Sequence, residues 1–287
     1  QDTSMSGQVV VVTGGGGGIG SAICRRLAAA GAKVVLTYRK SREKTEAVAN
    51  SLPGEGHLVR QAPVNDSAAM QRLAAEVAER YQRLDLLVNN AGITRPVPHD
   101  DLDSLDDEII DQIFQVNWRG AFASVRAFRN LLEQGEGGTV VNISSVAGFH
   151  AMPILTPYAC SKFALEAFTE GLRREMMLYG IDVVAINPGP IKTPIWDKAQ
   201  ELDPEQYGQT DFIKAIHRLL KFTLNSAENG LPPERVAQAI HAALTDKKPK
   251  LNTVVTPTPL QGLLLKLMPR RMADKMITSQ LGLKRLN

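Results

Sequence analysis

A tyrosine and a lysine four residues apart are the first candidates for chemistry in this sequence. Tyr158 and Lys162 stand in the segment YACSK, and no other tyrosine has a lysine at that spacing. On a helix, residues four apart share a face, so the ammonium would lie near the phenol. A nearby positive charge lowers the pKa of a phenol from its usual value of about 10. The pair therefore predicts a general acid/base, although a tyrosine–lysine pair on a helix surface also arises by chance.

A run of five glycines is the second candidate site. The segment VVVVTGGGGGIGSAI reads as a strand, a glycine turn and the start of a helix near Ile19. Glycine permits positive φ angles and a close backbone approach to an anion, and the N-terminus of a helix attracts negative charge. A flexible glycine linker is the alternative, but the run is wedged between an apolar strand and an amphipathic helix. We expect these residues to bind a dinucleotide pyrophosphate: Gly14, Gly16, Gly17, Gly18, Ile19 and Gly20.

The end of the second expected strand bears on which dinucleotide binds. In a fold of this type the residue there meets the adenosine ribose, and an acid would bind the free 2′-hydroxyl of NAD. This chain instead has Tyr38, Arg39, Lys40 and Ser41. Two cations and a hydroxyl suit a 2′-phosphate, so NADP(H) is the predicted cofactor and NAD(H) the alternative. A solvated basic turn without a ligand is the other interpretation.

Strands and helices alternate along the rest of the chain. Apolar runs such as IDVVAI are typical of parallel strands covered on both faces. We expect an α/β fold, a single Rossmann-type domain over residues 1–287 with about seven parallel strands in a doubly wound sheet and helices on both faces. The expected strands are Val9–Val12, Lys33–Thr37, Leu58–Gln61, Leu84–Val88, Thr139–Ile143, Asp182–Ile186 and Asn252–Val255. The expected helices are Ser21–Ala30, Glu43–Leu52, Ser67–Arg80, Asp106–Leu132 and Tyr158–Tyr179.

Six motifs in this order make the sequence similar to the short-chain dehydrogenase/reductase family. They are TGGGGGIG, NNAG at 89–92, VNWRG around Asn117, ISS at 143–145, YACSK and NPGPIKT at 187–193. The resemblance runs motif by motif from Gly7 to Thr193. It implies an NAD(P)-dependent oxidoreductase that interconverts a carbonyl and a secondary alcohol.

The resemblance also implies catalytic roles. Tyr158 would exchange a proton with the substrate oxygen, and Lys162 would lower the pKa of Tyr158 and hold the nicotinamide ribose. Ser145, thirteen residues before the tyrosine, would hydrogen-bond the substrate oxygen where negative charge develops. Asn117 would hold a water in a proton relay behind Lys162, with a helix bulge or cap as the alternative role.

Further cofactor contacts follow from the same resemblance. Pro63 stands where the family commonly has an acid that meets the adenine, so the side chain there offers no such contact. Gly17 stands where NADP-preferring members often have a basic residue, which leaves Arg39 and its neighbours to bind the phosphate. The remaining contacts would come from Val64, Asn90, Ala91, Gly92, Pro188, Gly189, Ile191 and Thr193.

Apolar side chains flank these motifs and bear on the substrate. The resemblance implies a pocket above the nicotinamide, and a long connection at residues 190–230 is predicted as its lid. Such a pocket favours a lipophilic carbonyl or alcohol, steroid-like, retinoid-like or long-chain, although the same side chains could merely pack the lid onto the body. A second candidate is a 3-oxoacyl chain on a carrier protein, and a third is a non-catalytic NADP-binding regulatory protein. The predicted lining residues are Ser145, Phe149, Met152, Ile154, Ile195 and Trp196.

Composition limits the compartment and the partners. The net charge of +3 and the hydrophobic fraction of 44% are ordinary for a globular protein, and no nucleic-acid module is recognisable. Cys24 and Cys160 show no disulfide or metal spacing, which predicts two small apolar fillers in a reducing, cytoplasmic compartment. A homodimer or homotetramer is expected from the resemblance. The basic amphipathic tail at 248–287 is expected to pack on protein, with contact to an anionic membrane surface as the alternative.

Overall fold

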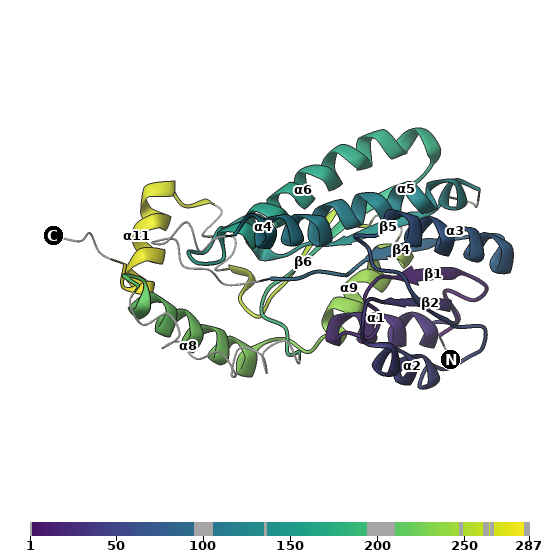
Figure 1. Cartoon of the computed structure of the whole chain (residues 1–287), viewed down its shortest axis with the longest axis horizontal. Coiled ribbons are helices and arrows are strands. Elements are labelled where there is room, and N and C mark those ends of the chain that lie inside the picture. The colour runs from purple at the N-terminus through teal and green to yellow at the C-terminus, as the bar shows by residue number, and fades with distance from the viewer. Residues whose placement is uncertain are drawn as a thin grey trace.

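Seven parallel strands form the centre of the molecule (Figure 1). The computed structural model describes residues 2–94, 106–134, 137–193, 210–246, 249–260, 264 and 267–283. The strand order is β3-β2-β1-β4-β5-β6-β7, and every neighbouring pair is parallel. This confirms the predicted Rossmann-type sheet. The strands are β1 (Val9–Val12), β2 (Lys33–Tyr38), β3 (Leu58–Gln61), β4 (Leu86–Asn89), β5 (Thr139–Ile143), β6 (Asp182–Pro188) and β7 (Asn252–Val255).

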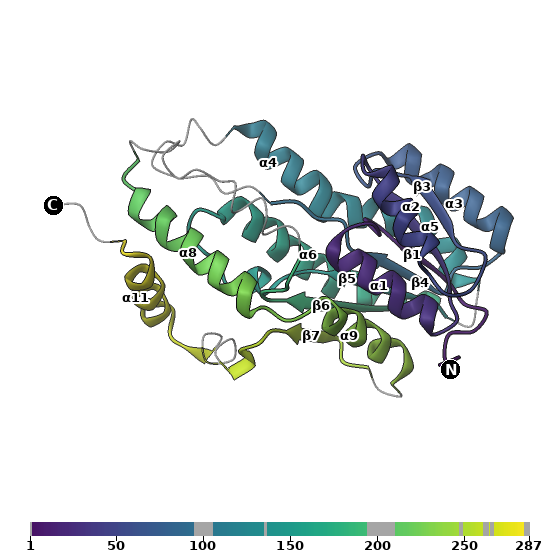
Figure 2. The same ribbon diagram turned by 90° about the horizontal axis from the view of Figure 1, so that it is seen from below.

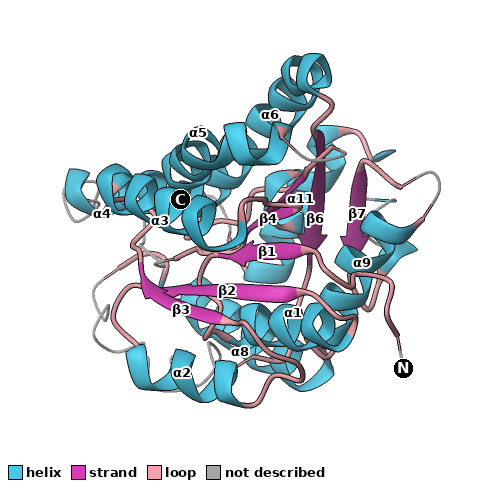
Figure 3. Ribbon diagram, turned by 90° about the vertical axis from the view of Figure 1, so that its right-hand side faces the viewer, coloured by secondary structure: helices cyan, strands magenta, loops and turns pink. Residues whose placement is uncertain are grey.

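Helices cover both faces of this sheet (Figure 3). One face carries α1 (Gly18–Ala29), α2 (Arg42–Asn50) and α9 (Glu234–Thr245). The other carries α3 (Ser67–Tyr81), α5 (Gly120–Glu133) and α6 (Thr156–Met176). Strand β1 shows why both faces are apolar, since Val10 and Val12 join one buried cluster while Val9 and Val11 join the other.

The strand order reverses direction between β1 and β4, the point at which such sheets bind ligands beyond the carboxyl ends of their strands. Here the segments that follow the two strands are bonded together. The Asn90 backbone N–H donates to Thr13 Oγ1 (3.0 Å), and Asn90 Nδ2 donates to the carbonyls of Thr13 (3.0 Å) and Gly14 (3.2 Å). The glycine turn is thereby fixed against the NNAG segment.

The prediction of one continuous α-helix at Asp106–Leu132 is wrong in one respect. The structure divides it into α4 (Asp107–Phe114), a π-helical turn η2 (Gln115–Arg119) and α5. A π turn inserts an extra residue into the helix, and such turns occur often at functional sites. Because apolar residues continue at helical spacing on both sides of it, the sequence pattern does not reveal the insertion. Asn117 lies inside this turn.

Two helices near the C-terminal end form a separate layer that extends beyond the sheet (Figures 1 and 2). They are α8 (Ile213–Asn229), in the predicted lid region, and α11 (Arg270–Leu281), in the predicted tail. Apolar residues of α8, α11 and the 152–155 segment form a third buried cluster. The tail therefore packs on protein through Leu281, as expected.

Other apolar side chains of the tail stay exposed, including Leu260 (74%) and Leu267 (73%). Contact with an anionic membrane surface stays a prediction. Within the described ranges, every helix is too short or too polar to cross a lipid bilayer.

The two cysteines differ in their surroundings. Cys24 is fully buried in α1, where it serves as the expected small filler. Cys160 is exposed on α6, so the same expectation is wrong there, because residues 159, 161 and 162 occupy the face of the helix that meets the sheet. Both thiols are free. A cytoplasmic location stays a prediction.

Candidate active site

Helix α6 carries the tyrosine and the lysine in its first two turns. It begins at Thr156 with Pro157 near its start, a position where the missing N–H costs no helical hydrogen bond. The Lys162 Nζ lies 5.7 Å from the centroid of the Tyr158 ring, which confirms that the two side chains share a face. Lys162 is 5% exposed, and its Nζ donates to the carbonyl of Ile143 (3.0 Å), the last residue of β5. The lysine thus connects α6 to the carboxyl edge of the sheet.

Burial shifts the pKa values of this pair in opposite directions. Burial raises the pKa of Tyr158 above its usual range, and a hydrogen bond with Ser145 opposes this only in part. This direction is opposite to the one expected from Lys162, because burial of the phenol is the largest cause. Burial also lowers the pKa of Lys162 to about 8, against the charge of Glu166, which raises it. At neutral pH the phenol is therefore protonated and able to donate, and the lysine is mostly an ammonium.

Two neighbouring serines follow β5, and only one of them meets the tyrosine. Ser145 is 7% exposed, its Oγ accepts from the N–H of Ala147 (3.1 Å), and its hydroxyl lowers the pKa of Tyr158. The Ser144 Oγ is buried and has no hydrogen-bond partner among the described residues. The geometry therefore favours Ser145, the serine that the sequence singled out.

Asn117 joins the segment after β4 to α6. Its Oδ1 accepts from the N–H of Ile93 (2.8 Å), and its Nδ2 donates to the Ile93 carbonyl (2.8 Å) and to Ser161 Oγ (3.0 Å). Ser161 Oγ in turn donates to the carbonyl of Tyr158 (2.7 Å). Both Nδ2 donors and one acceptor position of Oδ1 are used in these bonds, and Asn117 lies in the π turn, which agrees with the helix-bulge alternative. The water relay stays a prediction.

The glycine turn has the shape that a pyrophosphate requires. Gly14 has a φ of +66°, and a Cβ on Gly20 would lie 2.2 Å from the Gly14 carbonyl oxygen and 2.8 Å from Asn90 Nδ2. Helix α1 starts so close to the turn that no side chain fits between them. Gly17, which precedes α1, has no side chain to cap the first-turn N–H groups, so these donors stay available to an anion.

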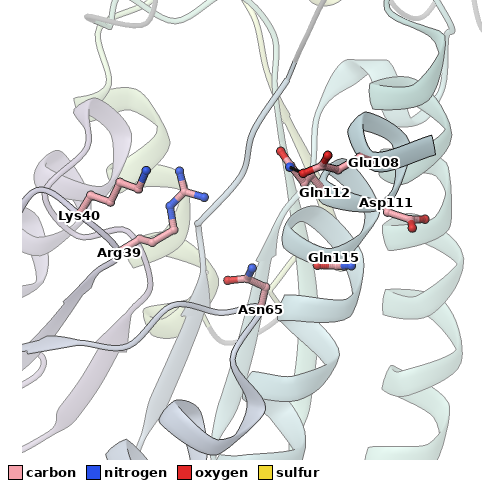
Figure 4. A pocket seen from close by; sticks show the side chains of 7 residues that line it. All are labelled: Arg39, Lys40, Asn65, Glu108, Asp111, Gln112 and Gln115. Carbon is pink, nitrogen blue, oxygen red and sulfur yellow. Dashed lines mark hydrogen bonds between the residues drawn. The ribbon is translucent and has the colours of Figure 1, made fainter. Parts of the chain in front are cut away.

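A cavity of about 690 Å³ lies between the loops after β2 and β3 and the helix α4 (Figure 4). Arg39 and Lys40 enter it from the loop after β2, Asn65 enters it from the loop after β3, and polar residues of α4 and η2 face them from the opposite side. The cavity confirms that the two cations lie together at a concave site. Tyr38 and Ser41 are not among its lining residues, which are Arg39, Lys40, Asn65, Glu108, Asp111, Gln112 and Gln115.

Five of these lining residues were not anticipated. Asn65 is two residues after Pro63, and its amide supplies a donor and an acceptor where the family's acid is missing. The sequence held one signal for this position. Asn65 directly precedes Asp66, the cap of α3, and therefore lies in the loop after β3 at the carboxyl edge of the sheet. The α4 and η2 residues could not be found from sequence, because nothing in it shows which side of α4 faces the cavity.

The other predicted cofactor residues lie beyond the carboxyl ends of the strands. Val64 is buried against Gly120, Asn90 and Ala91 contact Thr13, and a Cβ on Gly92 would lie 3.7 Å from Lys162 Nζ. After β6 the N–H of Gly189 donates to the Val255 carbonyl (2.9 Å) and Ile191 pairs with Leu231, so Pro188 to Thr193 passes over the end of β7.

The predicted substrate pocket is only partly described. Phe149 follows the short 3-10 turn η3 (Val146–Gly148) and is half-buried. Ile154 is 3% exposed and, with Met152, packs on α8 and α11, so these two residues join the predicted lid region to the body. Ile154 also has a φ of 73°, a strained conformation for a β-branched residue. Ile195 and Trp196 lie outside the described residues.

The chain belongs to the short-chain dehydrogenase/reductase family. The family model described as short chain dehydrogenase matches residues 8–203. An NADPH-dependent 3-dehydrocapnine reductase from Ornithobacterium rhinotracheale is 36% identical over 92% of this chain and 93% of the relative. A 3-oxoacyl-[acyl-carrier-protein] reductase from Synechocystis sp. is 31% identical over 76% of this chain and 90% of its own length.

A solved structure extends the match to three dimensions. A short chain dehydrogenase from Burkholderia cenocepacia, crystallised in complex with NADP, superposes with a TM-score of 0.71 at 30% identity, covering 88% of this chain and 97% of that one. The protein is thus an NAD(P)-dependent oxidoreductase that acts on CH–OH or C=O groups. The cofactor supplies or accepts the hydride.

The close approach of Gly20 to the glycine turn gives the first testable prediction. We expect Gly20→Ala to weaken NADPH binding at least about tenfold and to lower the free energy of unfolding by about 1–3 kcal/mol, because the added methyl displaces the Gly14 carbonyl. Fluorescence titration and denaturant unfolding measure the two effects. Gly171→Ala in α6 is the matched control, since its Cβ meets nothing within 4 Å and the change should stabilise the helix by about 0.5–1 kcal/mol. Unchanged NADPH affinity in Gly20→Ala would contradict the predicted phosphate cradle.

Proposed function

We propose that this enzyme uses NADPH to reduce the carbonyl of a lipophilic substrate to a secondary alcohol. The observation that carries the proposal is the buried Tyr158 phenol, whose ring centroid lies 5.7 Å from the Lys162 Nζ and whose pKa is raised by burial. A phenol held in its neutral form is ready to give a proton to an oxygen that gains negative charge. Ser145 would donate a second hydrogen bond to the same oxygen. The backbone N–H groups of the glycine turn would orient the cofactor.

The choice of NADPH is supported by the cavity at the loop after β2. Arg39 and Lys40 project into it, and a planar guanidinium suits the oxygens of a 2′-phosphate. The 36% identical relative is an NADPH-dependent reductase, which agrees with this assignment. Glu108 faces the cations across the cavity and disfavours a phosphate on its own side, so the phosphate belongs on the Arg39 side (Figure 4).

The lipophilic substrate class is supported by the surroundings of the catalytic pair. The segment between Ser145 and Tyr158 carries Met152, Ile154 and Leu155, which pack on α8 and α11. We propose that α8 and α11 form the substrate lid, since they are attached to the very segment that separates the catalytic serine and tyrosine. An apolar roof over a few polar groups is the usual arrangement for an apolar ligand.

A carrier-bound 3-oxoacyl chain is the second candidate, and the Synechocystis relative is the observation in its favour. Of the three arginines that would meet an acidic carrier, Arg129, Arg173 and Arg174, two have acidic partners on their own helix. Arg129 pairs with Glu133 and stacks on Tyr179, and Arg174 pairs with Glu170. Local partners reduce the positive field that a carrier protein would require. This candidate therefore ranks below a free lipophilic carbonyl.

Tyr158→Phe tests the function itself. With NADPH and a panel of ketones and aldehydes graded by chain length and ring count, we expect wild-type turnover to rise with lipophilicity. The variant should lose about 10²–10⁴-fold in kcat because the proton donor is gone, while NADPH binding survives. Absorbance of the reduced nicotinamide follows the reaction, and Tyr179→Phe is the control that should keep full activity. No turnover by the wild-type enzyme with any free carbonyl, despite NADPH binding, would favour the carrier-bound or regulatory candidates.

Arg39→Ala tests the cofactor assignment. We expect the KM for NADPH to rise about 10–100-fold and the KM for NADH to stay constant, because only NADPH carries the phosphate that the guanidinium contacts. Arg42→Ala is the matched control, since Arg42 is paired with Glu46 and does not line the cavity. Equal changes for the two cofactors would refute the assignment.

We also propose that the protein is a homodimer joined across α5 and α6. Three large side chains on η2, α5 and α6 are exposed, namely Trp118 (37%), Phe122 (43%) and Phe163 (45%). Aromatic residues at such a surface are typical of protein interfaces. We expect Phe163→Asp to convert the dimer to monomer in light scattering after size-exclusion chromatography. Phe222→Asp on α8, where the exposed fraction is 57%, should leave the dimer intact, and a monomeric wild-type protein would rule the proposal out.

A further inference from the structure

Glu166 lies on the same face of α6 as the catalytic lysine, one turn later. Each of its two carboxylate oxygens accepts a hydrogen bond from the side-chain amide of an asparagine. Asn187 Nδ2, at the end of β6, donates to Oε1, and Asn252 Nδ2, at the start of β7, donates to Oε2 (3.1 Å). Hydrogen bonds to an ionised carboxylate are stronger than neutral ones. One side chain thus ties α6 to two neighbouring strands of the sheet.

The same network reaches the catalytic serine. Asn187 is fully buried, and its Nδ2 donates a second hydrogen bond to the Ser145 carbonyl (3.3 Å). The 3-10 turn after the serine lies directly on the Glu166 stem, since a Cβ on Gly148 would be 2.9 Å from Glu166 Cγ. The backbone on both sides of the Ser145 hydroxyl is therefore set by Glu166 and its amide partner.

Glu166 also acts on Lys162 through its charge. Lys162 is buried, and burial disfavours an ammonium unless a negative charge lies nearby. Glu166 raises the pKa of Lys162 against this effect, and it is the one charged side chain in the described ranges that does so. Other titratable groups lie on α6 or on elements packed against it without shifting that pKa: Asp107, Glu108, Asp111, Arg119, His150, Tyr158, Cys160, Glu170, Arg173, Arg174, Glu175, Tyr179 and Asp182.

We propose that Glu166 is a positioning residue for the reaction, which ties α6 to β6 and β7, sets the backbone of Ser145 and keeps Lys162 positively charged. The inference rests on the proposed function, because it assigns Glu166 to the service of Ser145 and Lys162. Glu166 itself contacts neither substrate nor cofactor. It links the orientation of the serine to the charge of the lysine, so that both depend on a single carboxylate.

Glu166→Gln removes the charge while keeping the size of the side chain. The activity that needs the Lys162 ammonium is present below its pKa of about 8 and is lost as the pH rises through that value. In Glu166→Gln we expect kcat to fall about tenfold or more, with the KM for NADPH little changed. We also expect the basic limb of the kcat/KM profile to move to lower pH by at least about half a unit, because the lysine loses its stabilising charge. Glu170→Gln, one turn along the same helix on the exposed side, should match the wild-type enzyme.

Glu166→Asp separates charge from reach. It keeps the negative charge but is too short to hold both asparagines, so we expect a basic limb close to that of the wild type together with a reduced kcat. A basic limb in Glu166→Gln at the wild-type pH would overturn the proposal, whatever its kcat, because a purely structural brace would do no more. If Glu166→Gln does not fold, Asn252→Ala removes one donor at an exposed position, and wild-type kinetics in that variant would overturn the proposal too.

A measurement without turnover separates this inference from the proposed function. The pKa of Lys162 can be followed by ¹³C NMR of the labelled lysine Cε in the wild-type protein and in each variant. A lower pKa in Glu166→Gln than in Glu170→Gln supports the inference even if no carbonyl in the panel is reduced. Equal values overturn it even if the wild-type enzyme proves to be a reductase.

Discussion

The contact between Asn90 and the turn after β1 fixes the point from which the rest of the site is laid out. The strand order runs in opposite directions from β1 and from β4, which leaves a crevice beyond the carboxyl ends of these two strands. Ligands bind in such a crevice. The Asn90 side chain spans the two loops and satisfies the carbonyls of Thr13 and Gly14. Gly14 and Gly20 lie so close together that a methyl group on Gly20 would collide with the Gly14 carbonyl. This close approach places the start of α1 at the same crevice. The cofactor cradle is thus a consequence of how two loops are bonded together.

Helix α6 is attached to the sheet by polar as well as apolar contacts. Thr169 Oγ1 accepts from Asn142 Nδ2 (2.9 Å), whose own Oδ1 accepts from Asn89 Nδ2 (2.8 Å). Glu166 and Lys162 continue this row toward the catalytic end of the helix. Buried polar groups are costly unless they are paired, so each pair admits one register of α6 against β5 and β6. That register places Tyr158 beside Ser145 rather than beside Ser144.

Burial is the physical effect that sets the protonation of both Tyr158 and Lys162. Removing a phenol from water disfavours its anion, and removing an ammonium from water disfavours its cation. Both effects operate here, so Tyr158 holds its proton while Lys162 can lose its own only slightly above neutral pH. The bound cofactor adds its own charges to this balance, and Glu166 adds the negative charge that the buried lysine needs. This balance underlies the proposed direction, the reduction of a carbonyl.

The sequence alone determined the sheet and the residues of the catalytic centre. Apolar runs predicted the central strands, because a strand buried on both faces must be apolar throughout, and short β-branched segments between helices predicted the edge strands β3 and β7. The ordered motifs singled out Tyr158, Lys162, Ser145 and Asn117 as candidate site residues. Tertiary structure decided what periodicity cannot encode. The π turn at Asn117 leaves the apolar spacing intact, the rise in the Tyr158 pKa depends on how deeply it is covered, and Asn65 and the α4 residues share a cavity only because separate elements meet there. Nothing in the sequence indicated the role of Glu166 either. Its partners Asn187 and Asn252 lie 21 and 86 residues away along the chain, on two strands that only the folded sheet brings side by side.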